Sequence, residues 1–146
     1  MVHYLVKIIF LLFIIMPNNI HSCLIQGINR EVHILNSLPG NTPQLEFHCA
    51  SGDDELGYHY PAIGSDFNWQ FCATSNTLFF CHFWWGDKDS SFDVFNRIES
   101  CVWWDGVDFV PVDAVKCLWK VQDDGFYLGY FDEKANKNFY KKYRNW

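Results

Sequence analysis

Several sequence features that mark common functional classes are absent from this chain. None of its six cysteines forms a CxxC pair, which argues against zinc ribbons and dithiol redox sites. No GxSxG motif marks a nucleophilic serine, and no EF-hand loop marks a calcium site. No Asn-X-Ser/Thr sequon is present, so we expect no N-glycosylation. These absences remove the most easily recognised enzyme and metal-binding classes.

No apolar run is long enough to span a membrane, which takes about 20 residues. The longest run, IIFLLFIIM at residues 8–16, follows Lys7 and ends at Pro17. A basic start, a short apolar core and a polar continuation are typical of a secretory signal. We therefore predict a signal peptide over residues 1–22 and a mature domain over residues 23–146, which is secreted to the extracellular space and not inserted in a membrane.

Positive charge is scarce as well. The chain has 11 Lys+Arg against 17 Asp+Glu. Lys7 is the only charged residue of the predicted signal, so the mature domain keeps 10 basic residues against 17 acidic ones, a net charge of −7. Such a charge argues against nucleic acid or an anionic membrane surface as the partner. It would suit a basic partner surface.

Aromatic and apolar residues, in contrast, are plentiful. Of the 146 residues, 49% are hydrophobic and 19% aromatic, which is enough for one domain with a real core. Short stretches of period-two alternation recur between turn residues, and no long stretch has a helical period. We predict an all-β fold, a compact antiparallel β-sandwich of about eight strands, stabilised by disulfides. The predicted strands cover residues 30–38, 44–50, part of 55–64, 66–72, 77–85, 92–98, 116–124 and 126–131.

Two segments do not read as regular strands. Acidic residues and Pro111 interrupt residues 103–114, which we predict to be a long loop. The tail, residues 132–146, is compatible with a short helix, an edge strand or a mobile end. Its basic residues stand out in an acidic chain and are Lys137, Lys141, Lys142 and Arg144.

The segment HCASGDDELGYH, residues 48–59, raises the question of a metal or catalytic site. Its three acidic residues, 53–55, are adjacent, so they cannot easily converge on one ion. Strand alternation places His48 on the face opposite the core-facing Cys49. We interpret the segment as a polar loop between two strands. We expect no metal site, no cofactor and no catalytic residues.

Tryptophans suggest a different class of function. Exposed tryptophans on a secreted β-sandwich can stack on sugar rings, and the candidates are Trp84, Trp85, Trp103 and Trp104. Because neighbouring strand residues point to opposite faces, we expect one of Trp84 and Trp85 to be in the core. A glycoside hydrolase would need two carboxylates flanking a cleft, which the sequence does not place. A secreted carbohydrate-binding, lectin-like module is therefore the alternative function.

A series of short motifs runs in one order through most of the mature chain. They are VHI, HC.S.DDELG.H, F.W.F, TLFFCHFWW, FDVF and C.W.V..DGFY, within residues 32–128. In order and spacing they resemble the plant self-incompatibility S1 proteins, also called S-protein homologues. The resemblance implies a small secreted plant protein with a β-sandwich fold and no enzymatic activity. It further implies an extracellular ligand that a membrane receptor recognises, as in the rejection of self pollen, and it would place the lectin-like alternative at the cell wall.

The resemblance also implies which cysteines are structural. Cys49, Cys81 and Cys117 match recurrent cysteines of the family. Cys101 is the expected fourth, although the 15 residues between it and Cys117 exceed the usual gap, which keeps Cys72 as the alternative. On this basis we expect bridges between Cys49 and Cys117 and between Cys81 and Cys101. The states of Cys72 and of Cys23, beside the predicted cleavage point, stay open.

We expect the partner, a plasma-membrane receptor protein, to contact two polar loops, residues 86–91 and 104–113. The candidate partner-binding residues are Asp87, Lys88, Asp89, Asp105, Asp108 and Asp113. Acidic side chains there would meet a basic patch on the receptor, which speeds association and makes it sensitive to salt. We expect the protein to be a monomer and to bind no nucleic acid.

Overall fold

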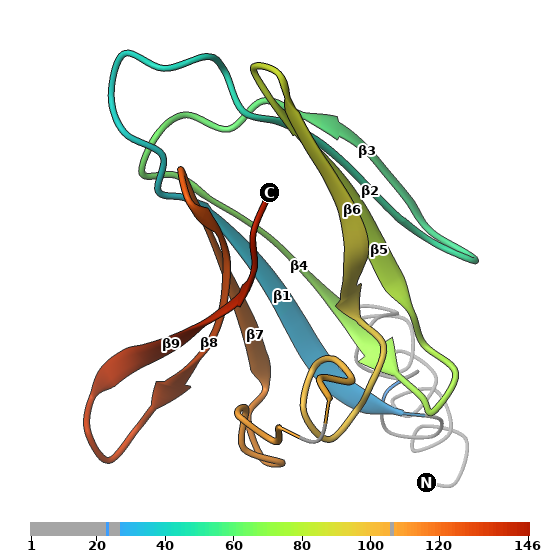
Figure 1. Ribbon diagram of the computed structural model, residues 1–146. Coiled ribbons are helices and arrows are strands. Elements are labelled where there is room, and N and C mark those ends of the chain that lie inside the picture. Colours follow the sequence, from blue (N-terminus) through green and yellow to red (C-terminus); the bar gives the residue numbers. More distant parts are fainter. Residues whose placement is uncertain (1–22, 24–26, 106) are drawn as a thin grey trace, which may run out of the picture.

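The computed structural model describes residue 23, residues 27–105 and residues 107–146, whose strands form two sheets (Figure 1). The strands are β1 (Ile28–Asn36), β2 (Glu46–Ser51), β3 (Glu55–His59), β4 (Asp66–Ala73), β5 (Phe79–Trp85), β6 (Lys88–Phe95), β7 (Lys116–Gln122), β8 (Gly125–Asp132) and β9 (Lys137–Arg144). One sheet has five strands in the order β4-β1-β7-β8-β9, and the other has four in the order β3-β2-β5-β6. All neighbouring strands are antiparallel except β1 and β7, which are parallel.

The predicted all-β sandwich is confirmed, with two differences in its strands. The tail forms a ninth strand, β9, at the edge of the five-stranded sheet. β6 begins at Lys88, inside a segment that we expected to be a turn, because a turn of only two residues, Gly86 and Asp87, joins it to β5. Gly86 has a φ of 57°, which glycine adopts readily and which suits the tight hairpin.

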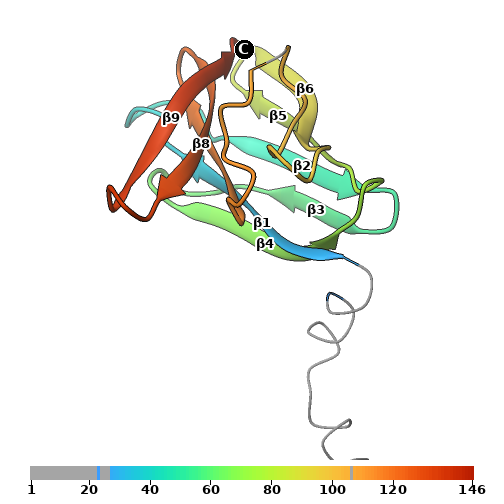
Figure 2. The same cartoon turned by 90° about the horizontal axis from the view of Figure 1, so that it is seen from below.

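The loop between β6 and β7 lies across one end of the sandwich, between the two sheets (Figure 2). It contains the described residues of the segment 103–114, for which a long loop was predicted. The signal peptide predicted over residues 1–22 lies outside the described residues. In the part of the chain that the structure describes, no helix is long and apolar enough to cross a membrane.

The core lies between the sheets and is built from side chains that alternate along each strand. Val32 and Ile34 of β1 are fully buried, as are Phe47 of β2 and Phe83 of β5 from the opposite sheet. Trp119 of β7 is the largest of these buried side chains, and its Nε1 donates a hydrogen bond of 2.9 Å to the carbonyl oxygen of Val94. Burying one such side chain stabilises the fold by about 1.5–3 kcal/mol.

The disulfide pairing differs from the expected one. Cys49 lies directly opposite Cys81 in the β2–β5 register, with their Cα atoms 4.2 Å apart, and the two form a bridge within one sheet. Cys117 of β7 is bonded to Cys101, at a Cα–Cα distance of 5.7 Å. The expected bridges Cys49–Cys117 and Cys81–Cys101 are therefore wrong, because they ignored which cysteines the strand register places side by side.

A third disulfide joins Cys23 to Cys72 on β4. Every described cysteine is therefore bonded. The bridge attaches a residue next to the predicted cleavage point to the edge of the five-stranded sheet.

Candidate functional site

The six candidate partner-binding residues form two groups at opposite ends of β6. Asp87, Lys88 and Asp89 belong to the β5–β6 hairpin, where β6 begins, whereas Asp105, Asp108 and Asp113 belong to the loop that follows it. Figure 1 shows the hairpin and the loop at opposite ends of the sandwich. The two groups therefore make two separate acidic surfaces rather than one.

In the hairpin group, two of the three side chains have partners within the protein. The Asp89 carboxylate lies 3.0 Å from Nε2 of His82. Lys88 donates a hydrogen bond of 2.8 Å to the carbonyl oxygen of Asp123, and its ammonium lies 4.8 Å from the centre of the Trp85 ring. Lys88 thus links the hairpin to the β7–β8 turn of the other sheet, which is a structural role.

In the loop group, Arg97 organises the exposed surface. Its guanidinium lies 4.5 Å from the centre of the Trp103 ring and 3.2 Å from the Asp108 carboxylate. A third contact, of 3.4 Å, joins Arg97 to Glu99. The Cys101–Cys117 bridge fixes the same loop to β7. The loop is therefore held in place by covalent, ionic and stacking contacts.

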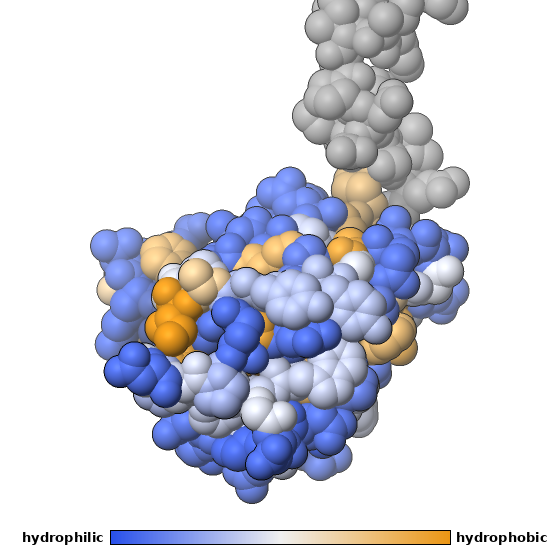
Figure 3. Space-filling view, turned by 90° about the horizontal axis from the view of Figure 1, so that it is seen from above, coloured by the Kyte–Doolittle hydropathy of each residue, from blue (hydrophilic) through white to orange (hydrophobic). Residues whose placement is uncertain are grey.

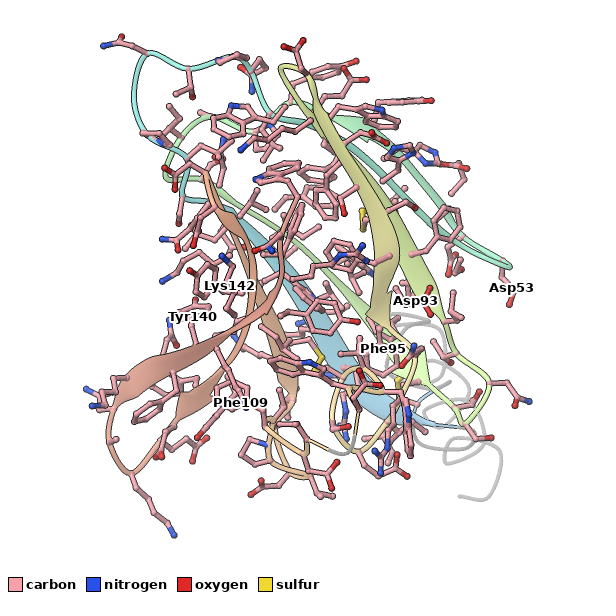
Figure 4. All side chains as sticks on the ribbon, viewed as in Figure 1. Asp53, Asp93, Phe95, Phe109, Tyr140 and Lys142 are labelled. Atoms are coloured by element: carbon pink, nitrogen blue, oxygen red, sulfur yellow. A yellow bond between two sulfur atoms is a disulfide. The ribbon has the colours of Figure 1, made fainter. Side chains whose placement is uncertain are left out.

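Asp113 lines a cavity of about 450 Å³ between this loop and the β8–β9 hairpin. Its charged lining residues are of both signs and are Asp113, Lys116, Asp132, Glu133 and Lys134. Phe109, labelled in Figure 4, lies beside the loop at this end of the sandwich, whereas Tyr140 lies further along β9. The mixed charge gives the cavity no clear preference for an ionic ligand.

The segment 48–59 spans β2, a turn and β3, and its histidines point in different directions. His48 pairs with Glu55 on the outer side of the sheet, whereas His59 bonds the carbonyl oxygen of Leu56 at 2.8 Å and packs on the Phe67 ring at 3.8 Å. Across the described residues, no group of three or more His, Cys, Asp or Glu side chains could hold a metal ion.

Trp84 and Trp85 lie on opposite faces of β5, as alternation predicted. Trp85 packs against Trp146 near the core, and its Nε1 donates a hydrogen bond of 3.1 Å to the carbonyl oxygen of Pro43. Trp84 lies on the outer side, stacked on His82 with the ring centres 3.8 Å apart and on Tyr58 at 6.1 Å.

The outer side of the four-stranded sheet is a surface that the sequence-based predictions missed; we call it the aromatic face. Its outward-pointing residues are Glu46, His48, Ala50, Glu55, Tyr58, Tyr60, Phe80, His82, Trp84, Asp89, Ser91 and Asp93. Tyr58 and Tyr60 are 59% and 61% exposed. Alternation along each strand, combined with the two-residue turn that sets the β5–β6 register, could have revealed it.

Charge is distributed in rows across the aromatic face. Glu46 of β2, Trp84 of β5 and Asp89 of β6 lie side by side in the strand register, so a carboxylate flanks the indole on each side. Tyr60 lies beside Glu46 in the same row. Partial desolvation, together with the charge of Glu46 and a hydrogen bond to it, raises the pKa of Tyr60. Four acidic residues, two histidines and no lysine or arginine occur on this face.

On the outer side of the five-stranded sheet and in its β7–β8 turn, Glu31 and Asp124 each pair with a lysine. Burial favours the neutral form of Glu31, but hydrogen bonds from His33, Lys116 and Gln70 outweigh it, and the pKa of Glu31 is lowered overall. Asp124 accepts hydrogen bonds from Lys142 and Tyr127, which lower its pKa. Each of these two carboxylates thus has a lysine partner within the protein.

Comparisons with known proteins give one consistent result. The family model described as "Plant self-incompatibility protein S1" matches residues 31–146. S-protein homolog 3 of Arabidopsis thaliana is 30% identical over 99 residues, which are 66% of this chain and 61% of that protein.

Two further relatives from the same plant agree. S-protein homolog 2 is 32% identical over 98 residues (66% of this chain, 57% of that protein), and S-protein homolog 24 is 35% identical over 92 residues (61% and 54%). The chain therefore spans between 54% and 61% of the length of these three relatives. No solved structure matches it.

Proposed function

Because the chain belongs to the plant self-incompatibility protein S1 family, we propose that it is a secreted extracellular ligand recognised by a plasma-membrane receptor protein. Rejection of self pollen is one process in which such a ligand would act. Family membership is the observation that carries this proposal, and it favours a binding role over catalysis.

The build of the molecule supports a ligand. Three disulfides and a shared core hold the sandwich, so its loops are already ordered before a partner binds. Ordered loops lose less conformational freedom on association, and more of the contact energy then contributes to affinity. The loop of Asp105, Asp108 and Asp113 is fixed to β7 by the Cys101–Cys117 bridge.

The lectin-like alternative receives less support from the tryptophans that suggested it. A sugar ring needs an open aromatic face on which to stack. Lys88 lies over Trp85, Arg97 over Trp103 and Lys141 over Trp104. The fourth, Trp84, has one face stacked on His82. Three of these four rings therefore already have a cation of this chain over them, and Trp84 is contacted by His82 on one side.

A binding experiment with the oxidised mature protein tests the proposal. We expect saturable, salt-sensitive binding to a protein of plasma-membrane extracts, and no signal on a glycan array. Replacing Asp105, Asp108 and Asp113 together by Asn should weaken binding at low salt by about tenfold, because exposed charges act mainly through association rate. A selective glycan signal with no membrane-protein target would support the lectin-like alternative instead.

A further inference from the structure

Cations of this protein repeatedly lie over its own aromatic rings. Within the described residues, seven rings have a lysine or arginine of the same chain within 6 Å of the ring centre. The contacts are Lys88 on Trp85, Arg97 on Trp103, Lys120 on Tyr140, Lys137 on Phe139, Lys141 on Trp104, Lys142 on Tyr127 and Arg144 on Phe92. Such contacts are attractive because the face of an aromatic ring carries partial negative charge.

The aromatic face is the exception. None of the described lysines or arginines lies over the rings of Tyr58, Tyr60 or Trp84, because the outward-pointing residues of this face include no lysine or arginine. The exposed rings lie beside carboxylates that lack a lysine or arginine partner on this face. Glu46 and Asp89 flank Trp84, and Asp93, labelled on β6 in Figure 4, lies further along the same strand.

Elsewhere in the protein, an arginine binds a neighbouring ring and carboxylate at the same time. Arg97 stacks on Trp103 and at the same time pairs with the Asp108 carboxylate at 3.2 Å. A planar guanidinium can do both, since one surface covers a ring while its edge donates hydrogen bonds to a carboxylate. The aromatic face offers rings and carboxylates in the same proximity without a lysine or arginine. Two of its carboxylates, Asp89 and Glu55, contact the imidazoles of His82 and His48 instead.

We infer that the aromatic face is the docking surface for a partner polypeptide that presents arginine side chains. The guanidinium groups stack on the exposed Tyr58 and Tyr60 rings and on the free side of Trp84, and they pair with Glu46 and Asp89. This inference rests on the proposed function for the partner being a protein. It extends that proposal by adding a contact surface on the sheet to the one on the loops.

Charge complementarity and the form of the surface select this occupant. Hydroxyl groups of a neutral sugar can donate hydrogen bonds to carboxylates but leave their charge uncompensated, whereas a guanidinium supplies both the hydrogen bonds and the opposite charge. A lipid or apolar partner would need a continuous apolar patch. On the aromatic face, Trp84 instead lies between Glu46 and Asp89 in the strand register, so carboxylates interrupt the apolar surface. Figure 3 views the adjoining end of the sandwich, near the β5–β6 hairpin, where hydrophobic residues lie among hydrophilic ones.

A peptide titration tests the inference without any receptor. The probe is a synthetic Gly-Ser peptide with arginine at alternate positions, added to isotope-labelled, oxidised mature protein and followed by NMR. We expect shifts at the Trp84 indole and at Tyr58 and Tyr60. Replacing arginine by citrulline, which keeps the shape and removes the charge, should abolish them.

Two charge-matched double variants identify the surface. Glu46→Gln with Asp89→Asn should weaken peptide binding by about tenfold, because it removes both carboxylates beside Trp84. Asp132→Asn with Glu133→Gln removes the same charge from the β8–β9 hairpin, and affinity should stay within about twofold. The inference would be overturned if both variants lost the same affinity for the arginine peptide. It would also be overturned if the citrulline peptide caused the same NMR shifts as the arginine peptide, or if the shifts were confined to residues 96–115.

The two proposals fail separately. If the arginine peptide does not bind while membrane extracts still show a protein target, the aromatic face is excluded and the receptor-ligand function remains. If the peptide binds the aromatic face but no extract contains a protein target, the proposed function is lost and the arginine-binding surface remains. Receptor binding that is unaffected by Glu46→Gln with Asp89→Asn would overturn this face as the docking surface.

Discussion

The two outer sides of this sandwich use the same kinds of side chain in different ways. On the five-stranded sheet, Glu31 is surrounded by hydrogen-bond donors, and Lys120 covers the Tyr140 ring at 3.8 Å. Tyr140 and Lys142, both labelled in Figure 4, belong to β9 of that sheet. On the four-stranded sheet, rings and carboxylates occur together without a lysine or arginine.

This difference indicates which surface has carboxylates and rings available to bind a partner. A carboxylate whose charge and hydrogen bonds are satisfied within the fold contributes to stability and has little to offer a partner. A carboxylate beside exposed rings, with no cation of its own, keeps that capacity for a second molecule. The five-stranded outer side is therefore mainly structural, and the aromatic face is the surface we assign to recognition.

Removing the disulfide under the aromatic face should produce the largest effect. Cys49→Ala with Cys81→Ala opens a bridge between residues 32 apart in sequence, and we expect a loss of about 3–4 kcal/mol in the free energy of unfolding. Because the bridge joins β2 to β5, NMR signals of Tyr58 and Trp84 should change as well. Urea unfolding of the purified variant under oxidising conditions measures the loss.

The bridge of the β6–β7 loop is the matched control for that experiment. Cys101→Ala with Cys117→Ala opens a loop with a sequence separation of 16, which predicts a loss of about 3 kcal/mol. The signals of the aromatic face should stay in place in this variant. A pattern in which only the control disturbs Tyr58 and Trp84 would contradict the assignment of the first bridge to this face.

A smaller effect should separate the two outer sides by their carboxylates. Glu31→Gln should lower the free energy of unfolding at neutral pH by about 1–3 kcal/mol, because it removes a charged acceptor of several hydrogen bonds. Glu46→Gln, on the aromatic face, should change it by no more than about 0.5 kcal/mol. Equal losses would mean that the two sides do not differ as described.

The pH dependence of that difference has a defined sign. The pKa of Glu31 is lower in the folded protein than its ordinary value, so its stabilising contribution is present above the unfolded-state pKa of about 4.3. It is lost as the pH falls through the lower, folded-state pKa. The stability gap between wild type and Glu31→Gln should therefore close in acid, which urea titrations at a series of pH values would measure.

Local sequence patterns predicted most of the strands, but they did not predict which strands and which cysteines pair with each other. Alternation placed Trp84 and Trp85 on opposite faces and located most strands within a few residues. The pairing of Cys49 with Cys81 depends on which strands are neighbours, and the position of Asp89 beside Trp84 depends on the register set by a two-residue turn. Both require information about strand order that period-two alternation does not contain.

The edge strand β9 could not be predicted from hydrophobic alternation either. Its basic residues interrupted the apolar pattern, so the tail could equally be a helix, a strand or a mobile end. In the structure, Lys141 and Lys142 cover the rings of Trp104 and Tyr127. Charged residues on a strand edge also discourage pairing with other chains. Polar residues here have a packing role that hydrophobicity alone does not reveal.

The smallest expected effect comes from a variant that gives the aromatic face a lysine, as the outer side of the five-stranded sheet already has. Ser91 is exposed on β6 opposite His82, so Ser91→Lys would place a cation on the aromatic face with little change in packing. Stability should change by no more than about 0.5 kcal/mol. Affinity for the arginine peptide should fall by about threefold, since the new ammonium repels guanidinium groups and pairs with nearby carboxylates.

Ser91→Gln provides the matched control for that variant, because its side chain is long and polar but carries no charge. It should leave affinity for the arginine peptide close to that of the wild type in the same NMR titration. If the lysine and glutamine variants weaken binding equally, bulk rather than charge explains the loss. Charge would then not explain the difference between the outer side of the five-stranded sheet, which has its own lysines, and the aromatic face, which has none.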